Sequence, residues 1–321
     1  MSRTDWFRQC GWGVFCHYLG APPSSSGGAE LTAEAWNTQV DAFDVPGLAR
    51  QLQSVGAPYF FITIGQNSGH FLAPNPTYDR YVGIAPSKCA RRDLVADLYD
   101  ALHPLGIELL VYLPAGAPAA DPVAMQRLGW EWGYEGGWPH GHSVRTGKRL
   151  ADFQRKWEDI ISDWSLRWGP KVRGWWIDGC YFADEMYRHD DAPNFASFAA
   201  SLRAGNADSI VAFNPGVKVP VICHAEEEDY TAGEVAQALP ECPGPWVERN
   251  GHRAQYHLLS YLGAYWCKGE PRFPDDMVAG YTRHVIERGG VMTWDVPIAT
   301  SGLIPEPFVR QLRALRDRLQ R

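Results

Sequence analysis

Short apolar runs alternate with longer amphipathic stretches along most of this 321-residue chain, and this alternation restricts the fold more than any other feature. A short run of β-branched, aliphatic or aromatic residues predicts a buried strand, whereas apolar residues repeating every three to four positions predict a helix. Strands that alternate with helices are typical of a parallel sheet covered by helices. The predicted strands are GWGVFCH (11–17), YFFITIG (59–65), IELLVYL (107–113), GWWID (174–178), SIVAFNP (209–215), the region of PVICHA (220–225), the region of HLLSYLGAYW (257–266) and GVMTWDVP (290–297).

The helical stretches complete this pattern and indicate one closed architecture. RRDLVADLYDALHPLG (91–106) and FQRKWEDIISDWSLRWG (153–169) each predict a helix that ends near a glycine and leads into a strand. About eight strands and at least six helices, with no Ser/Gly linker to divide them, predict an α/β fold: a single (β/α)8 TIM-type barrel domain over residues 1–321. We expect the long irregular stretches 114–147 and 226–253 to fold over the catalytic face of this barrel.

Composition excludes several classes of partner and cofactor. The net charge is −7, and the Lys and Arg residues are scattered, so attraction to nucleic acid or to an anionic membrane is not expected. No apolar run has membrane-spanning length and no signal-peptide pattern opens the chain, which predicts a cytoplasmic protein. Seven Cys without a C-x-x-C pair favour reduced thiols over disulfides or a zinc site. No nucleotide-binding motif follows a strand, so no cofactor and no metal are predicted.

Polar and aromatic side chains gather at the predicted C-terminal ends of the strands, where a barrel of this kind carries its active site. They combine acids, amides and aromatic rings, a mixture that suits the hydroxyls and C–H faces of a sugar. The chain is therefore predicted to act on a carbohydrate or glycoside substrate. The strand-end candidates are His17, Gln66, Asn67, Tyr112, Trp176, Asp178, Asn214, Trp294 with Asp295, and a carboxylate from HAEEEDYTAGE (224–234).

Several segments resemble the α-L-fucosidase family of glycoside hydrolases, family 29, in the order in which that family has them. DWFRQCGWGVFCHYLG (5–20) resembles its opening helix and strand, and FDVPGLARQLQSVGAPYFFITIG (43–65) resembles its next helix and strand. GWWIDG (174–179) resembles its nucleophile segment, and GGVMTWDVPIATSGLIPEPFVRQL (289–312) its final strand and helix. The resemblance touches most of the chain and is most specific around Asp178.

The resemblance implies a role for the carboxylate that ends GWWID. Asp178 would be the nucleophile that forms a covalent glycosyl-enzyme, with Trp176 on the same strand face beside the sugar. The alternative is that Asp178 caps the following helix. His17 matches the family's strand-end histidine that contacts the sugar, although a hydrogen-bonded core histidine is the alternative reading.

A retaining mechanism also needs a carboxyl group that acts first as an acid and then as a base. In one branch of the family this Glu precedes an Ala-Gly-Glu, and Glu228 stands in that relation to Ala232-Gly233-Glu234. Glu228 is therefore the predicted acid/base. Its rivals are Glu226, Glu227 and Glu234, with Glu34 and Asp295 as remoter candidates.

The chain departs from the family at two places that would contact the sugar. GQNSGHF (65–71) puts Gln66 and Asn67 where the family has two histidines, and His70 looks inserted. In AEAWN (33–37), an Ala precedes Trp36 where the family has a Glu. Amides still donate and accept hydrogen bonds to hydroxyls, so an altered sugar specificity is expected.

These observations predict a retaining exo-glycosidase that removes a terminal fucose-like sugar. Two other classes of function stay open. One is a metal-assisted hydrolase on the same barrel, using His17, His70 or His224 with Asp178. The other is a catalytically silent carbohydrate-binding barrel that has kept the nucleophile segment.

Overall fold

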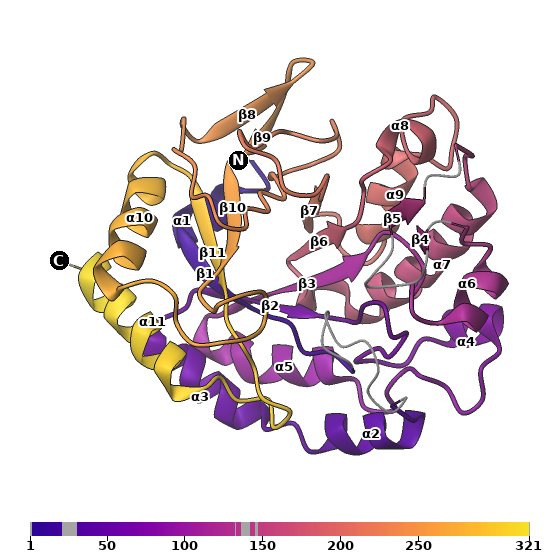
Figure 1. Ribbon diagram of the computed structural model, residues 1–321, viewed down its shortest axis with the longest axis horizontal. Coiled ribbons are helices and arrows are strands. Elements are labelled where there is room, and N and C mark those ends of the chain that lie inside the picture. Colours follow the sequence, from indigo (N-terminus) through magenta and orange to yellow (C-terminus); the bar gives the residue numbers. More distant parts are fainter. Residues whose placement is uncertain (1, 21–30, 132, 136–141, 145–146, 321) are drawn as a thin grey trace.

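A computed structural model describes residues 2–20, 31–131, 133–135, 142–144 and 147–320. Its main feature is a curved sheet of seven parallel strands, with helices packed around the outside of the curve (Figure 1). The architecture is α/β and similar to a TIM barrel, as the sequence predicts. In spatial order the strands are β10 (His257–Tyr261), β11 (Val291–Asp295), β1 (Trp12–Cys16), β2 (Tyr59–Thr63), β3 (Glu108–Pro114), β6 (Gly174–Asp178) and β7 (Ile210–Phe213).

The helices follow the predicted alternation, and side-chain caps fix where many of them begin. Asp44, Asn75, Asp93 and Asp121 each precede a helix and accept a backbone N–H from its first turn. The helices are α1 (Asp5–Cys10), α2 (Ala33–Asp41), α3 (Val45–Val55), α4 (Pro76–Val82), α5 (Leu94–Leu102), α6 (Pro122–Leu128), α7 (Ala151–Trp168), α8 (Ala183–Met186), α9 (Phe195–Leu202), α10 (Asp275–Glu287) and α11 (Glu306–Leu319). No helix in the described part of the chain is long and apolar enough to cross a membrane.

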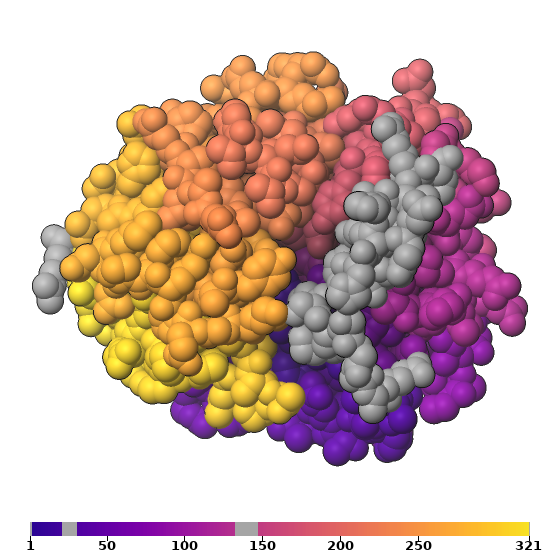
Figure 2. All heavy atoms as spheres, viewed as in Figure 1, coloured from indigo at the N-terminus to yellow at the C-terminus, as the bar shows by residue number. Residues whose placement is uncertain are grey.

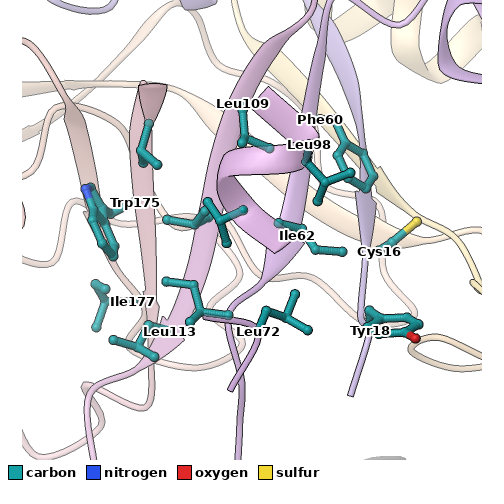
Figure 3. Close-up of a cluster of buried hydrophobic side chains, with 14 of the residues drawn as sticks. Cys16, Tyr18, Phe60, Ile62, Leu72, Leu98, Leu109, Leu113, Trp175 and Ile177 are labelled. Atoms are coloured by element: carbon teal, nitrogen blue, oxygen red, sulfur yellow. The ribbon is translucent and has the colours of Figure 1, made fainter. Parts of the chain in front are cut away.

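Side chains alternate between two buried clusters along each strand. On one face, Trp175 and Ile177 of β6 pack with Ile62 and Leu113 and with the helices (Figure 3). On the other face, residues such as Trp176 fill the inside of the curve. Successive strand residues point to opposite faces, so a side chain at the end of a strand reaches the inner site only if its position alternates with the outward-facing ones. We call this the parity of a strand position.

Residues 229–235 fill the gap between β7 and β10 without forming a regular strand, so the prediction of a closed eight-stranded barrel is wrong. The segment hydrogen-bonds to both neighbours. The Asp229 N–H donates to Val211 O on β7 at 2.9 Å, and the Val235 N–H donates to Leu259 O on β10 at 3.0 Å. The sheet position expected of an eighth strand is thus occupied by an irregular segment.

Two carboxylates explain why no regular strand pairs with β7. Glu228 Oε1 accepts the N–H of Phe213 at 2.8 Å, and Asp229 Oδ2 accepts the N–H of Val211 at 3.0 Å. These side chains occupy the donors that a paired strand would have used. The strand predicted around residues 220–225 is also absent, since that stretch has no regular secondary structure.

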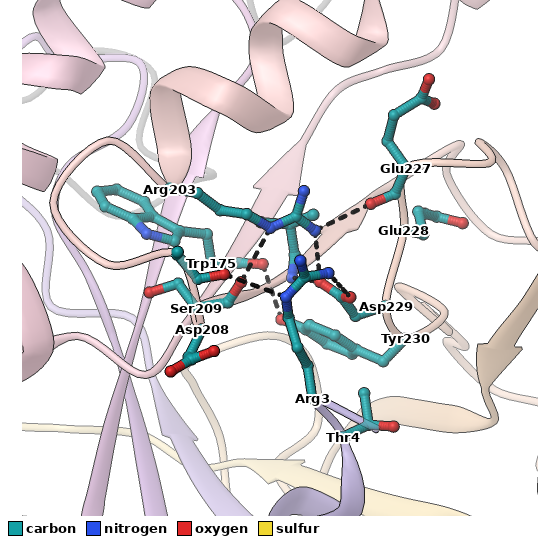
Figure 4. A network of polar contacts seen from close by, with 12 residues as sticks. Arg3, Thr4, Trp175, Arg203, Asp208, Ser209, Glu227, Glu228, Asp229 and Tyr230 are labelled. Carbon is teal, nitrogen blue, oxygen red and sulfur yellow. Dashed lines mark hydrogen bonds and ion pairs between the residues drawn. The ribbon is translucent and has the colours of Figure 1, made fainter. Parts of the chain in front are cut away.

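An ion-pair network holds the start of the segment (Figure 4). Arg203 donates to Asp229 Oδ2 at 2.5 Å and to the carbonyl oxygen of Glu227 at 3.1 Å, and Arg3 donates to Asp229 Oδ1 at 3.2 Å. Asp229 therefore joins the N-terminal segment, helix α9 and strand β7.

The two long irregular stretches carry short secondary structure of their own. Residues 114–147 include α6 and the strand pair β4 (Gly133–Glu135) and β5 (His142–Val144). Residues 226–253 include β8 (Trp246–Arg249) and the start of β9 (His252–Gln255), which together form a hairpin. The hairpin projects beyond the end of the sheet in Figure 1. In Figure 2, C-terminal segments (orange and yellow) and N-terminal and central segments (indigo to magenta) fill opposite halves of the visible face.

Candidate active site

Asp178 is the centre of a group of polar side chains at the carboxyl end of the sheet. It ends β6 on the inner face, where its carboxylate accepts the Tyr112 hydroxyl at 2.6 Å and the Asn214 amide at 2.8 Å. The Tyr181 hydroxyl adds a longer contact of 3.3 Å. The next helix, α8, has Phe182 at its N-cap and no side-chain cap. Asp178 is therefore not a helix cap, and its oxygens are bound by the side chains around it.

Tyr112 and Gln66 form a short relay to this carboxylate. The Gln66 amide donates to the Tyr112 oxygen at 2.7 Å, and the single phenolic proton of Tyr112 then goes to Asp178. The ring of Tyr112 stacks on Trp176 with centroids 5.4 Å apart. Burial raises the pKa of Tyr112 well above its ordinary value, so the hydroxyl stays protonated as a donor.

Glu234 is the second carboxyl group of the site, and one amide joins it to Asp178. Asn214 is fully buried, and its Nδ2 donates to Asp178 Oδ1 at 2.8 Å and to Glu234 Oε2 at 2.7 Å. The two bound oxygens are therefore no farther apart than about 5.5 Å.

The setting of Glu234 favours its protonated form. Burial first, and then the charge of Asp178, raise the pKa of Glu234 to about 7, while the Asn214 amide and nearby His17 oppose the rise. A carboxyl group with such a pKa can give up and take back a proton near neutral pH. Glu234 and Asp178 therefore form a pair in unlike environments, one polar and hydrogen-bonded and the other desolvated.

His17 occupies the opposite side of the site and is held by a buried carboxylate. Its Nδ1 lies 2.7 Å from Asp295 Oδ1, and Asp295 also accepts the backbone N–H of Cys267 at 2.8 Å. An ionised carboxylate only accepts, so Nδ1 donates and Nε2 remains for another partner. Three aromatic rings surround the imidazole, with centroids 4.5 Å away for Phe15, 5.6 Å for Tyr112 and 5.9 Å for Trp266.

Two aromatic residues of the site were missed by the sequence reasoning. Tyr181 lies three residues after Asp178, and its position within GWWIDGCYF was a usable signal. Trp266 follows β10 and packs against Tyr261 at 4.8 Å as well as against His17. Its place after a strand end was the only sign of it in the sequence.

Other predicted residues lie away from this group. The Trp36 indole is fully buried in the outer core and donates to Phe71 O, and His70 packs beside it with centroids 5.8 Å apart. Trp294 is on the outer face of β11, where its N–H donates to Thr282 on α10. Asn67 directly follows Gln66 of the site and is half-buried, and its carbonyl oxygen accepts the N–H of Ala120 at 2.9 Å.

Glu228 also lies apart, with its carboxylate bound by backbone. Its two oxygens accept the N–H groups of Phe213 at 2.8 Å, His224 at 2.6 Å and Ala225 at 3.3 Å. Burial raises the pKa of Glu228 to about 8, and these three donors oppose the rise. Both oxygens are thus committed to holding the turn that precedes residues 229–235.

The remaining carboxylate candidates have other partners. Glu226 accepts the amide of Asn250, and Glu34 is an exposed partner of Arg91. Among the four glutamates of the acidic stretch, Glu234 is the one whose side chain shares a partner with Asp178.

The three histidines considered for a metal site do not gather around Asp178. The ring nitrogens of His224 contact Cys180 O at 2.9 Å and Arg188 at 3.3 Å, and those of His70 are buried beside Trp36. Within the described ranges, no group of three or more His, Cys, Asp or Glu side chains is placed to hold a metal ion.

Comparison with known proteins identifies the fold. No family model matches the sequence, and no curated protein does. Among solved structures, the chain is similar to P5AFcnA, an endo-fucoidan hydrolase of glycoside hydrolase family 107, with a TM-score of 0.68 and 15% identity over 100% of this chain and 94% of that one. Longer endo-fucoidan hydrolases of that family are matched over 53% and 63% of their length.

Two α-L-fucosidases are similar to the same extent. Isoenzyme 1 from Paenibacillus thiaminolyticus has a TM-score of 0.65 and 16% identity, with 99% of this chain and 75% of that one covered. A fucosyltransferase mutant of the α-L-fucosidase AlfC has a TM-score of 0.66 and 13% identity, with 99% and 98% covered. At these identities the comparison establishes the fold, which this chain shares with fucose-active glycoside hydrolases.

Proposed function

We propose that the protein is a retaining glycoside hydrolase that removes a terminal fucose-like sugar, with Asp178 as the nucleophile and Glu234 as the acid/base. The observation that carries this proposal is the Asn214 amide, which binds both carboxyl groups with its one nitrogen. The limit of about 5.5 Å that it sets between the two bound oxygens supports a covalent mechanism, in which the two carboxyl groups lie about 5 to 5.5 Å apart, over an inverting one, in which they lie farther apart. Glu234 replaces Glu228 in the role expected from the sequence, because both oxygens of Glu228 are bound by backbone.

In the first step, the Asp178 carboxylate attacks the anomeric carbon of the bound sugar. The bond from that carbon to the leaving-group oxygen breaks, and the proton of Glu234 passes to that oxygen. A pKa of about 7 keeps Glu234 protonated in mildly acidic solution, as this step requires. The hydrogen bonds from Tyr112 and Asn214 orient Asp178 for the attack.

In the second step, Glu234 acts as a base. It takes a proton from water, whose oxygen attacks the anomeric carbon and breaks its bond to Asp178. The charge of Asp178 helps to raise the pKa of Glu234. That contribution disappears once Asp178 is esterified, so the pKa of Glu234 falls in the intermediate and its ionised form becomes available to accept the proton.

The sugar would be held by the groups opposite the two carboxyls. His17, fixed by Asp295, offers a ring nitrogen, Gln66 offers amide atoms, and Trp266 offers an aromatic face. We infer a fucose-like sugar from the resemblance to family 29 and from the fucose-active enzymes among the structural neighbours. We infer that one terminal sugar is removed because α-L-fucosidases are among the structural neighbours. Gln66 and Asn67, in place of two histidines, make an altered specificity our expectation.

Azide rescue of two alanine variants tests the assigned roles. The substrate is the aryl glycoside that wild-type protein turns over best in a panel of α-L-fucoside, α-L-galactoside, β-D-arabinoside and unrelated sugars. In Glu234→Ala, azide should attack the glycosyl-Asp178 and yield a glycosyl azide of retained configuration. In Asp178→Ala, azide should attack the substrate directly and yield the inverted azide. Proton NMR distinguishes the two products.

Three results would contradict the proposal. Full activity of Asp178→Ala would show that Asp178 is not the nucleophile. Rescue of Glu228→Ala with a retained product, while Glu234→Ala behaves as wild type, would return the acid/base role to Glu228. Tight sugar binding by wild-type protein with no turnover of any glycoside would favour a carbohydrate-binding barrel.

A further inference from the structure

Half of the large hydrophobic side chains that are exposed in the described part of the chain lie in one place. Val217, Val219 and Ile222 are 51%, 53% and 37% exposed and lie within six consecutive residues of the loop after β7. Tyr181, 49% exposed, belongs to the loop after β6. Scattered exposed apolar residues are ordinary, but a group of them next to a site indicates a binding surface. We call these four residues the apolar platform.

The loop that carries most of the apolar platform begins at the amide that binds the two carboxyl groups. The loop that carries its three aliphatic residues starts at Asn214, whose Oδ1 accepts the N–H of Gly216 at 3.1 Å. A Cβ added at Gly216 would lie 3.3 Å from the ring of Tyr181, so the loop runs against that ring. The Tyr181 hydroxyl in turn lies 3.3 Å from Asp178 Oδ1.

The two sides of the site differ in chemistry. His17, Gln66 and Trp266 face the carboxyl pair from β1, β2 and the loop after β10, and they offer hydrogen-bonding atoms and an aromatic face. The loop after β7 stands between the strand of Asp178 and the segment of Glu234. Since the acid protonates the leaving-group oxygen, the leaving group lies on the side of Glu234, whose partner Asn214 begins the loop that carries Val217, Val219 and Ile222.

We propose that the apolar platform binds the leaving group and that this group is an alkyl or aryl aglycone. This inference rests on the proposed function. Val217, Val219 and Ile222 have no side-chain donor or acceptor, so the hydroxyls of a further sugar would lose water without gaining partners. An alkyl or aryl group placed there would remove apolar surface of both molecules from water, which favours binding.

A pair of alkyl glycosides tests the inference. Methyl and hexyl α-L-fucosides, or the same pair for the sugar found in the panel, have leaving alcohols of similar acidity and differ mainly in apolar area. We expect kcat/KM of wild-type protein to be about tenfold or more higher for the hexyl glycoside, because part of the chain is buried on the platform. In Val217→Ser/Val219→Ser, that ratio should fall to within about threefold of one, with methyl glycoside turnover unchanged.

Leu166→Ser is the matched control, since Leu166 is an exposed residue of α7. It should keep the hexyl preference. Retained turnover of the methyl glycoside shows that each variant is folded, and Ile222→Ser replaces the double variant if that turnover is lost. Equal turnover of the two glycosides by wild-type protein would overturn the inference alone, as would a hexyl preference that the platform variants keep. Failure to hydrolyse either glycoside would overturn the proposed function as well.

Discussion

Replacing each of two buried glutamates by glutamine separates the catalytic carboxyl from the structural one. Glu234→Gln keeps an oxygen that can accept from Asn214 but has no proton to give at the required pKa. We expect kcat/KM for a methyl glycoside, whose leaving group needs an acid, to fall by about 10² to 10⁴. That loss corresponds to about 3 to 5 kcal/mol of transition-state stabilisation. The free energy of unfolding should change by less than about 1 kcal/mol.

Glu228→Gln should have the opposite effect. Both oxygens of Glu228 accept backbone N–H groups, and either oxygen keeps a lone pair whether or not the carboxyl is protonated. The amide nitrogen of glutamine has no free lone pair and would face the N–H of His224 or Phe213. Leaving one buried donor unsatisfied costs about 1 to 3 kcal/mol. Turnover per folded molecule should stay within about twofold of wild type.

Urea unfolding followed by tryptophan fluorescence measures the free energy of unfolding of each variant. Steady-state kinetics without urea at about pH 6 measures its turnover. The reasoning fails if Glu228→Gln abolishes turnover at unchanged stability while Glu234→Gln remains active. That outcome would mean that the acid acts from the backbone-bound position. It would also show that the shared Asn214 contact of Glu234 has no part in catalysis.

Two further predictions concern the groups that bind the carboxyl pair. The basic limb of the kcat/KM profile should lie near pH 7, because Glu234 must be protonated in the first step. Asn214→Ala removes a donor that lowers the pKa of Glu234, so the limb should move to higher pH as the rate falls, and an unmoved or lowered limb would contradict this. Gln66→Glu adds an acceptor that competes with Asp178 for the single proton of Tyr112, and kcat/KM should fall about tenfold or more. Gln66→His, which can still donate, should lose far less, and equal losses in the two variants would argue against the relay.

Much of the site follows from strand position and parity, which the sequence displays directly. Asp178, Tyr112, Asn214 and His17 were predicted from strand ends, and the structure brings these four side chains to one end of the sheet. In each predicted strand, polar or aromatic residues at the carboxyl end follow a run that can only be buried. Such a pattern needs no tertiary information beyond the closeness of parallel strand ends.

Parity also explains one residue that lies elsewhere. Trp294 and Asp295 are neighbours at the end of β11, so one of them must face the inner site and the other the helices. The run VMTWDVP does not state which, because both faces of a parallel strand are buried. The indole faces α10 and the carboxylate binds His17. Trp36 was proposed from resemblance alone, and its N–H is used to hold the outer core.

The acidic stretch could not be assigned by position because it does not form the strand that position implies. Glu228 and Asp229 turn inward to satisfy β7, and the chain then passes Tyr230 and Ala232 on the inner face before it reaches Glu234. Tyr230, Ala232 and Glu234 are every second residue of DYTAGE, so the sequence contains this alternation. The three neighbouring glutamates, 226–228, offered competing candidates, and the alternation alone did not decide between them. Arg203 fixes Asp229 at one end of this segment, and Asn214 holds Glu234 at the other. The irregular eighth position therefore joins the ion pairs that stabilise the sheet to the carboxyl group that we assign to catalysis.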